Sequence, residues 1–391
     1  MASSIARSDY LRDVFMCSLG AYGGPEAHIG VLLDQLVTKK HYLNEEELIE
    51  LVALCSILPG PTSTQTIVAI GYKMGGPSLA LLTMMVWAAP VILLMTLLSF
   101  LYDILGYFHL SSDALRLIGP MAVGFIVVSA FRIGKKVLAN SLTWGLFLLA
   151  AIVTYIWRDV WVFPVVLLMG GIVSIIAEKE PGMWNRVKIR FPWRYFFAFV
   201  ILAIGSATII LVWDHPIMHL FASFYRYGYL VFGGGQVVVP MMVNELVDQL
   251  QYLSIQEFLV GYGLVQGLPG PMFSFSAYAG GMAVRGSGIL SQVGAALVSG
   301  LGIFLPGILL IFFVYPVWQD LKQIKAIRIS LRGINAVAGG LIATSSVLLL
   351  QKSGITWTNI VVVGLTILLL SSKKIPAPVI VILAILAGFL L

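Results

Sequence analysis

The sequence predicts an all-α integral membrane protein, formed by two homologous helical repeats in inverted topology with broken or re-entrant helices. Three observations lead to this prediction. Hydrophobic residue types make up 59% of the chain and charged types only 11%, whereas charged residues form about 25% of a soluble domain. A Pro-Gly-Pro motif recurs 210 residues further along the chain. A single apolar helix that belongs to neither copy comes directly after the most basic loop.

Apolar stretches long enough to cross a bilayer occur along most of the chain. A spanning helix needs about 20 mostly apolar residues, and we predict such helices near residues 77–102, 115–133, 142–157, 160–177, 196–213, 289–317, 333–350, 356–371 and 377–391. Shorter apolar stretches, interrupted by glycine or proline, lie near 11–30, 48–72, 217–239 and 255–283. Each interrupted stretch either crosses once or enters and leaves on one side, so the total is about 9 to 13 spans.

The charge and the cysteine content argue against several other classes of protein. The formal net charge is +6, but the positive-inside rule accounts for basic residues in short loops without nucleic acid as a partner. Cys17 and Cys55 do not have the spacing of a disulfide framework or a metal site. Pro216 separates His215 from His219, and no glutamate completes a metalloprotease motif. We therefore expect no metal and no cofactor, and the lack of a P-loop argues against an ATPase.

An internal repeat divides the chain into two copies. Pro59-Gly60-Pro61 recurs as Pro269-Gly270-Pro271, and the same offset of 210 residues relates Gly23-Gly24 to Gly233-Gly234. Later in the chain the offset drifts to 214, which relates Gly119 to Gly333. Several matches in one order and nearly one register indicate a duplication. We predict a first copy at residues 1–177, a linker at 178–214 and a second copy at 215–391.

The linker inverts the second copy relative to the first. Residues 178–195 form the most basic loop, which we place in the cytoplasm by the positive-inside rule. Residues 196–213 form one extra apolar helix, so the second copy enters the membrane from the opposite side. The loop at Arg132 is basic and predicted inside, whereas its counterpart holds only Lys352 and is predicted outside. Inverted repeats of this kind are a common design of secondary transporters.

The broken segments of both copies form the candidate substrate site. Proline and glycine interrupt helices, and the freed backbone groups survive at membrane depth only beside protein or water. A helix that restarts after Pro-Gly-Pro presents free N–H groups and the positive end of its dipole, which together can hold an anion. A single motif of this kind is usually a simple kink, but its pairing in both copies favours a site. We assign to it Gly24, Pro25, Glu26, Pro59, Gly60, Pro61, Thr62, Ser63, Thr64, Gln65, Gly233, Gly234, Gly235, Gln236, Pro269, Gly270, Pro271, Ser274 and Tyr278.

Four titratable residues near membrane depth are candidates for ion coupling or anion attraction: Glu26, His28, Lys73 and Arg132. Buried ionisable groups are costly in a bilayer and are often functional. Glu26 would repel an anion unless it were protonated, so it could couple transport to protons, and a structural role is equally open. For His28 we favour a packing role, and for Lys73 and Arg132 we favour side chains that reach the membrane interface.

The motifs resemble those of the chromate ion transporter family. The stretches Gly23 to Ile29 and Leu58 to Gln65 resemble its amino-terminal half. Phe232 to Gly235 with Pro240, and Leu268 to Phe273 with residues 278–280, are similar to its carboxyl-terminal half. One departure is Tyr22, where the family commonly has phenylalanine. The resemblance covers nearly the whole chain. It implies a long-chain, two-domain secondary transporter, multi-pass in the bacterial plasma (inner) membrane, which moves chromate outward and has sulfate as the related oxyanion.

Three functions come into question for such a site. The first is a secondary transporter of a small inorganic oxyanion, above all chromate export, with sulfate or another oxyanion as the alternative cargo. The second is a passive anion channel, which could use the same half-helices. The third is an intramembrane enzyme that uses Glu26 and His28, and we reject it because no set of nucleophile and base stands in a family-like spacing. The expected partners are the oxyanion, the lipid bilayer and a proton or counter-anion, with a homodimer as one option for the assembly.

Overall fold

A computed structural model describes residues 6–109, 111–159, 161–178, 183, 190–232 and 235–390. In this part of the chain every regular element is helical, and no strand occurs. Five of the described helical segments are long and apolar enough to cross a membrane: Thr62–Leu98, Asp113–Val137, Trp193–Val212, Ile289–Leu321 and Lys325–Ser353. Shorter apolar helices of 10–17 residues accompany them. The protein is therefore an all-α, multi-pass membrane protein, which confirms this part of the prediction.

The helices gather into two compact units, and each unit takes segments from both halves of the chain. Unit 1 comprises Met1–Ile104, Pro192–Tyr229 and Val265–Tyr315. Unit 2 comprises Leu105–Phe191, Leu230–Leu264 and Pro316–Leu391. The front part of the predicted first copy thus shares a unit with the middle of the predicted second copy.

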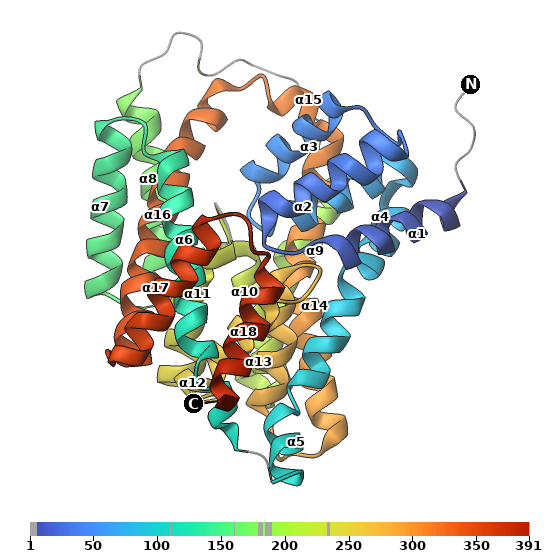
Figure 1. The fold of residues 1–391 in the computed structure, drawn as a ribbon. Helices are drawn as coiled ribbons and strands as arrows, with labels where there is room; N and C mark the ends of the chain where they lie inside the picture. The colour runs from blue at the N-terminus through green and yellow to red at the C-terminus, as the bar shows by residue number, and fades with distance from the viewer. Residues whose placement is uncertain are drawn as a thin grey trace. The chain divides into compact units, whose positions relative to one another are not determined.

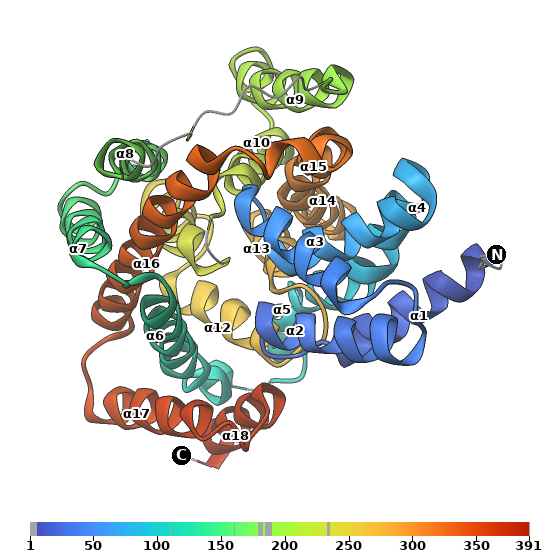
Figure 2. The same cartoon turned by 90° about the horizontal axis from the view of Figure 1, so that it is seen from above.

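Unit 1 contains both Pro-Gly-Pro motifs. In it α1, α2 and α3 pack on α4, and α13 packs on both α4 and α14, as can be seen in Figures 1 and 2. The helix α9 packs on α14. The elements are α1 (Arg7–Gly20), α2 (Pro25–Leu32), η1 (Leu33–Lys39), α3 (Glu45–Ile57), α4 (Thr62–Leu98), α9 (Trp193–Val212), α10 (Pro216–Leu230), η5 (Met272–Ser274), α13 (Phe275–Ala283) and α14 (Ile289–Val314), and α5 (Leu101–Tyr107) begins in this unit.

Each Pro-Gly-Pro motif leads into a helical hairpin. The helical angles of α4 are interrupted at Gly76, whose φ is +71°. The chain turns back there, so that a Cβ atom on Gly71 would lie 2.4 Å from Thr83 Oγ1. In the second copy α13 folds against α14 in the same way, and a Cβ atom on Gly280 would lie 2.1 Å from Ser299 Oγ. Glycine at these two positions lets the arms of each hairpin approach closely.

Unit 2 is arranged around α16. In Figure 2, α6, α7 and α8 flank this helix, and all three pack on it. Backbones approach closely at Gly333, where a Cβ atom would lie 2.0 Å from the carbonyl oxygen of Gly170. The elements are η2 (Ser112–Leu115), α6 (Ile118–Val137), α7 (Ser141–Ile156), α8 (Val162–Ala177), η3 (Gly235–Val238), α11 (Val239–Met242), η4 (Val243–Gln249), α12 (Ile255–Gln266), η6 (Tyr315–Val317), α15 (Trp318–Leu321), α16 (Lys325–Ser353), α17 (Trp357–Ser371) and α18 (Ala377–Leu390). The end of α12 and the first residue of η6 belong to unit 1.

The two halves of the chain repeat their local structures in order. A π-helical turn, which is a rare element and often lies at functional sites, occurs at Leu33–Lys39 and again at Val243–Gln249, 210 residues later. Asn44 and Glu47 form a capping box at the start of α3. Ser254 and Glu257 exchange the equivalent hydrogen bonds at the start of α12. These matches have the same offset as the motifs that indicate the duplication.

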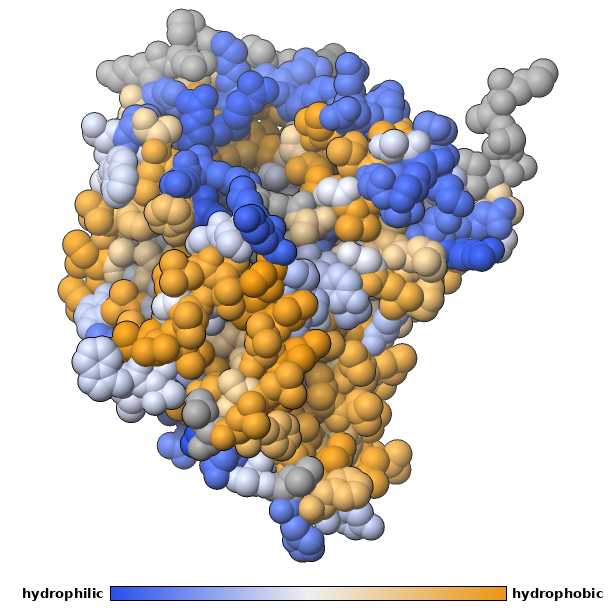
Figure 3. All heavy atoms as spheres, viewed as in Figure 1, coloured by the Kyte–Doolittle hydropathy of each residue, from blue (hydrophilic) through white to orange (hydrophobic). Residues whose placement is uncertain are grey.

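Apolar side chains are exposed where a bilayer would cover them. On α17 and α18, leucine and isoleucine residues such as Leu368, Ile382 and Leu386 are more than half exposed, and orange side chains cover the face of these helices that Figure 3 shows. Water would penalise so large an apolar surface, whereas lipid does not.

Candidate functional site

The glycine loop of the first copy is bound to the second Pro-Gly-Pro motif. Gly23 and Gly24 have φ values of +84° and +95°, a conformation that glycine adopts without strain. Just before them, the carbonyl oxygen of Ala21 accepts a hydrogen bond of 2.8 Å from the N–H of Gly270. Unit 1 therefore joins these two predicted parts of the site. The side chains of Pro25 and Glu26 lie outside the described part of the chain, as do Gly233 and Gly234.

The first Pro-Gly-Pro turn starts α4 without a capping side chain. Gly60 has φ +134°, and Pro61 is the residue that precedes the helix and makes no side-chain cap. The N–H of Gln65 donates to the carbonyl oxygen of Pro61 over 2.9 Å and so closes the first turn. The N–H groups ahead of it have no acceptor within the helix, as at any helix start.

Buried hydroxyl groups surround this helix start. The Nδ1 atom of His28 lies 3.0 Å from Ser63 Oγ. The indole N–H of Trp87 donates to Thr64 Oγ1 over 3.4 Å, and its ring meets His28 edge to face at 5.6 Å. The carbonyl oxygen of Trp87 in turn accepts a 2.7 Å hydrogen bond from Ser18. Trp87 thus links α1, α2 and both arms of the α4 hairpin.

The amide of Gln65 is only partly satisfied. Its Nε2 atom donates to the carbonyl oxygen of Pro59 over 2.8 Å and approaches that of Gly307 at 3.4 Å. Its Oε1 atom is buried and has no hydrogen-bond partner among the described residues. A buried acceptor without a partner costs free energy, so this atom favours a ligand or a water molecule that can donate.

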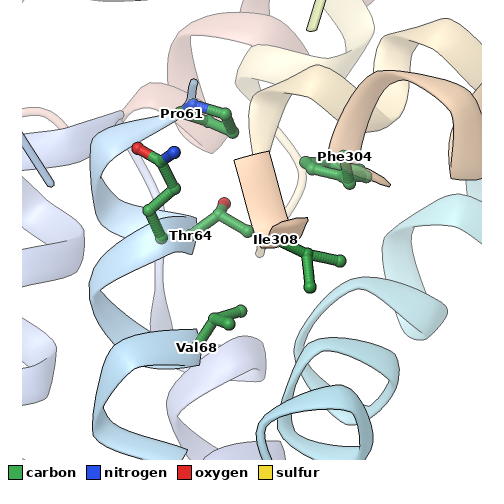
Figure 4. Close-up of a pocket in the computed structure, with 6 residues that line it drawn as sticks. Pro61, Thr64, Val68, Phe304 and Ile308 are labelled. Carbon is green, nitrogen blue, oxygen red and sulfur yellow. The ribbon is translucent and has the colours of Figure 1, made fainter. Parts of the chain in front are cut away.

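A cleft opens between α4 and α14 beside this turn. It is lined by Pro61, Thr64, Gln65, Val68, Phe304 and Ile308, none of which is charged. Figure 4 shows Pro61, Thr64 and Val68 along α4, facing Phe304 and Ile308 across the cleft. The empty volume is about 180 Å³ including open space around it, but the cleft is too narrow for a water molecule in this conformation. An oxyanion can enter only if the walls move apart.

The second Pro-Gly-Pro turn starts a short 3₁₀ turn, η5, which packs on both α4 and α14. The N–H of Ser274 donates to the carbonyl oxygen of Pro271 over 3.0 Å. Ser274 Oγ and Gln266 Nε2 are buried and have no hydrogen-bond partner among the described residues. Tyr278 is buried one turn later, with its ring 6.1 Å from that of Phe275. Both turns therefore lie in unit 1, and each has nearby a buried polar atom without a hydrogen-bond partner among the described residues.

Several predicted site residues lie elsewhere. Lys73 pairs with Glu47 at 2.5 Å, near the bend of α4. The hydrogen bond from Lys73, with help from the backbone of Asn44, lowers the pKa of Glu47. In unit 2, Arg132 is exposed and donates to the carbonyl oxygen of Leu370 over 3.2 Å. Gln236, which follows the glycines at 233–235, also belongs to unit 2. There its side-chain amide donates a hydrogen bond to Ser129 Oγ over 3.1 Å.

Sequence reasoning missed Trp87, Ser18, Phe304 and Ile308. One signal could have identified Trp87: tryptophan is enriched at membrane interfaces, and this one lies well inside a predicted span at 77–102 and is fully buried. No comparable signal marks Phe304 or Ile308, because they belong to an unbroken apolar stretch.

These features define a multi-pass membrane protein with paired helix breaks of the kind that secondary transporters use for binding. The family model described as "Chromate transporter" matches residues 9–175 and 218–389. The chain therefore belongs to the chromate transporter family. The two matched segments lie one in each half of the chain.

Curated relatives match nearly the whole chain. It is 26% identical to a protein of Synechococcus elongatus named "Probable chromate transport protein", over 96% of this chain and 93% of the relative. It is 25% identical to the "Chromate transport protein" of Cupriavidus metallidurans, over 94% of this chain and 88% of the relative. A shorter relative, "Uncharacterized transporter YwrA" of Bacillus subtilis, is 28% identical over 44% of this chain and 94% of its own length. No solved structure matches this chain.

Proposed function

We propose that this protein is a secondary transporter that carries chromate outward across the plasma membrane, and that the start of α4 forms half of its substrate site. The observation that carries this proposal is the uncapped start of α4, which opens with three hydroxyl residues and borders an uncharged cleft that is lined in part by Thr64 and Gln65. Free amides and hydroxyls at a positive helix end stabilise an oxyanion without a full positive charge. Membership of the chromate transporter family supports chromate as the oxyanion.

The second Pro-Gly-Pro turn supplies the other half of the proposed site. Its first element, η5, packs on α4 and α14, the two helices that form the cleft. The buried Ser274 hydroxyl and Gln266 amide are donors still available there. We propose that the two copies are inserted with opposite orientations, because the single extra helix α9 stands between them.

The hinge of the proposed transport cycle is the bend of α4. The cleft is too narrow for a ligand as it stands, so one wall must move during binding. Gly75 and Gly76 interrupt the helix at the bend, and such positions absorb the changes in φ and ψ that a domain motion requires. Movement of the Pro61 to Gly71 arm would widen the cleft while leaving α14 in place.

Glu26 and His28 are the proposed proton-coupling residues. His28 is bonded to Ser63 in the first turn of α4, so a change in its protonation reaches the proposed site through one hydrogen bond. The orphaned Oε1 atom of Gln65 accepts a hydrogen from a protonated oxyanion or a water, but repels a bare dianion. Both features favour an anion that travels with a proton.

The test is flux into liposomes that contain the purified chain. We expect saturable chromate movement against its gradient, driven by a proton or counter-anion gradient, and weaker chromate uptake in the presence of sulfate. Replacement of Pro59, Gly60 and Pro61 by alanine should abolish this flux while leaving membrane insertion intact. Glu26→Gln should change its dependence on pH.

Three outcomes would contradict parts of this proposal. Flux that runs only downhill and never saturates would make the protein a channel. Uphill transport of sulfate with no response to chromate would make sulfate the cargo. Cells that express the protein and accumulate more chromate than control cells would reverse the proposed direction.

A further inference from the structure

A second cavity lies within unit 2 and contains none of the residues assigned to the proposed substrate site. It spans about 370 Å³ of empty space, including its open mouth, and it is wide enough for a water molecule. Arg158, Asn244, Asp248 and Lys352 supply charged and polar groups to its lining, and residues such as Phe163 supply apolar walls. A cavity with both kinds of lining suits a ligand that carries charge, and it also suits an amphiphile.

The charged residues of this cavity stand at helix ends. Arg158 comes just after α7, Asp248 lies on the π-helical turn η4, and Lys352 occupies the last turn of α16. The carboxyl end of a helix stabilises a positive charge, so Lys352 is well placed as an ammonium ion. The predicted topology places the segment with Lys352 on the outer side of the membrane.

Positive charge is in excess inside the cavity. Lys352 forms an ion pair with Asp248. The distance between Lys352 Nζ and Asp248 Oδ1 is 2.5 Å. The guanidinium of Arg158 lies over the ring of Tyr155 at 5.5 Å, and its Nε atom donates to the carbonyl oxygen of Tyr155 over 3.2 Å. The two terminal nitrogens of Arg158 have no ion-pair partner among the described residues. One carboxylate therefore faces two cations.

Asn244 holds the arginine segment in place. Its side-chain amide donates to the carbonyl oxygen of Arg158, which ties the segment after α7 to the π-helical turn. This turn adds one residue to the helical repeat and carries both Asn244 and Asp248. The cavity is thus built by three elements that hydrogen bonds and an ion pair connect.

We propose that Arg158 and Lys352 form a binding site for a tetrahedral oxyanion group. In the absence of the ligand, Asp248 forms an ion pair with Lys352, and the ligand replaces Asp248 as the partner of this ammonium group. A guanidinium binds such a group with two parallel hydrogen bonds, and an ammonium adds a point charge. Two sources share this chemistry: a dissolved oxyanion such as sulfate, and the phosphate of an anionic phospholipid whose acyl chain lies along the apolar walls. The site does not depend on the function proposed for the Pro-Gly-Pro turns.

The first experiment measures binding of radiolabelled sulfate to the purified full-length protein in a neutral detergent. Asp248→Asn should lower the Kd about tenfold, because it frees Lys352 from its competitor. Arg158→Gln and Lys352→Gln should each raise the Kd at least tenfold, and Lys352→Arg should keep it within about threefold. The matched control is Asp34→Asn on η1, the corresponding π-helical turn, where an exposed Asp34–Lys39 pair at 2.6 Å lines neither cavity described above. It should leave the Kd unchanged.

The same series in the variant with alanine at Pro59, Gly60 and Pro61 separates this site from the proposed transport site. The effects of Asp248→Asn and Lys352→Gln should persist there, whether or not that variant transports chromate. Thermal unfolding without ligand shows which variants fold. If Lys352→Gln does not fold, two other measurements decide the result: the lower Kd for sulfate in Asp248→Asn, and the nearly unchanged Kd in Lys352→Arg.

The second experiment identifies the source of the oxyanion group. In mixed micelles, phosphatidylglycerol should raise the melting temperature of the parent more than phosphatidylcholine does if the ligand is a lipid, and Lys352→Gln should remove the difference. If sulfate binds and the lipid has no such effect, the source is a dissolved oxyanion. The proposal is overturned if Arg158→Gln and Lys352→Gln respond to both probes as the parent does. Equal effects of Asp248→Asn and Asp34→Asn would also overturn it.

Discussion

The two Pro-Gly-Pro turns of unit 1 share a sequence but lead into different structures. The first turn leads directly into α4, and the first residues of that helix are Thr62, Ser63 and Thr64. The second leads into a 3₁₀ turn that begins with Met272 and Phe273. The N–H of Gly270 in the second turn is already bonded to the carbonyl oxygen of Ala21. An amide that has an acceptor is not available to a ligand.

The two turns make different contributions to unit 1. The first turn presents the Thr64 side chain and a helix start to the cleft. The second fastens the glycine loop of the first copy to the core of unit 1 through Gly270. We therefore expect substitutions at the first turn to reduce transport more than equivalent substitutions at the second turn.

The largest difference should appear between Gly60→Ala and Gly270→Ala. Both glycines have φ values that favour glycine, +134° and +104°, so each substitution should cost about 1–3 kcal/mol of stability. Only at Gly60 would the new Cβ displace the Gln65 amide, which lies 2.4 Å away. Gly60→Ala should lower chromate flux more than tenfold, and Gly270→Ala less than threefold at equal protein in the liposome. Equal losses of flux would remove the distinction between the turns.

A smaller contrast should separate Thr64→Val from Ser274→Ala. Thr64 lines the cleft, and a hydrogen bond to a charged ligand contributes roughly 1.5–3 kcal/mol. Thr64→Val should therefore raise the KM for chromate about tenfold or more, and it should also lower the melting temperature because it leaves the buried indole N–H of Trp87 without its acceptor. Ser274 Oγ is buried without a partner among the described residues, so Ser274→Ala should leave the melting temperature unchanged or higher. A tenfold rise in KM for Ser274→Ala would instead make the second turn an equal contributor.

Trp87→Phe tests whether the first turn is positioned through the tryptophan. The change removes the hydrogen bond to Thr64 Oγ1 and leaves a small cavity, at a cost of about 1–3 kcal/mol. We expect a lower melting temperature and a severalfold lower kcat, with the KM shifted less. Trp144→Phe is the control, because Trp144 is half exposed on α7. A parent-like kcat for Trp87→Phe would show that the network does not position the turn.

The smallest effect concerns the Glu47–Lys73 pair beside the bend of the first hairpin. The pKa of Glu47 is lowered mainly by the hydrogen bond from Lys73, so its stabilising contribution is present above the ordinary value of 4.5 and is lost as the pH falls through the folded-state pKa. Both side chains are partly exposed, so the contribution is below about 1 kcal/mol. Glu47→Gln should flatten the melting temperature between pH 6 and 3, relative to the parent. A parallel pH dependence in both proteins would contradict this assignment.

Part of this molecule was accessible from the amino-acid sequence because its signals are local. Pro-Gly-Pro and Gly-Gly act on the backbone next to them, and α4 begins directly after Pro59-Gly60-Pro61, where the sequence places a helix start. The bend at Gly76 also falls between the two stretches that the sequence separates, 48–72 and 77–102. The predicted inversion and the predicted substrate site stay predictions.

The residues of α14 that line the cleft could not be predicted, because a helix in lipid lacks the apolar period that marks a buried face in water. In water, the buried face of a helix is recognised by its apolar period. In a bilayer both faces are apolar, so Phe304 and Ile308 on α14 look the same as the exposed Leu301 on that helix. The placement of Gln236 in unit 2 was likewise hidden, because no local pattern states which segments of a chain will share a compact unit.

The interleaving of the two units has a consequence for biosynthesis. Unit 1 lacks α13 and α14 until Tyr315 has left the ribosome, and unit 2 lacks its last helices until the end of translation. Helices of the first half therefore enter the membrane before the helices of the second half that pack against them have been synthesised. If the chain were severed in the loop at 178–195, neither fragment could complete a unit, and co-expressed fragments would have to restore both units together.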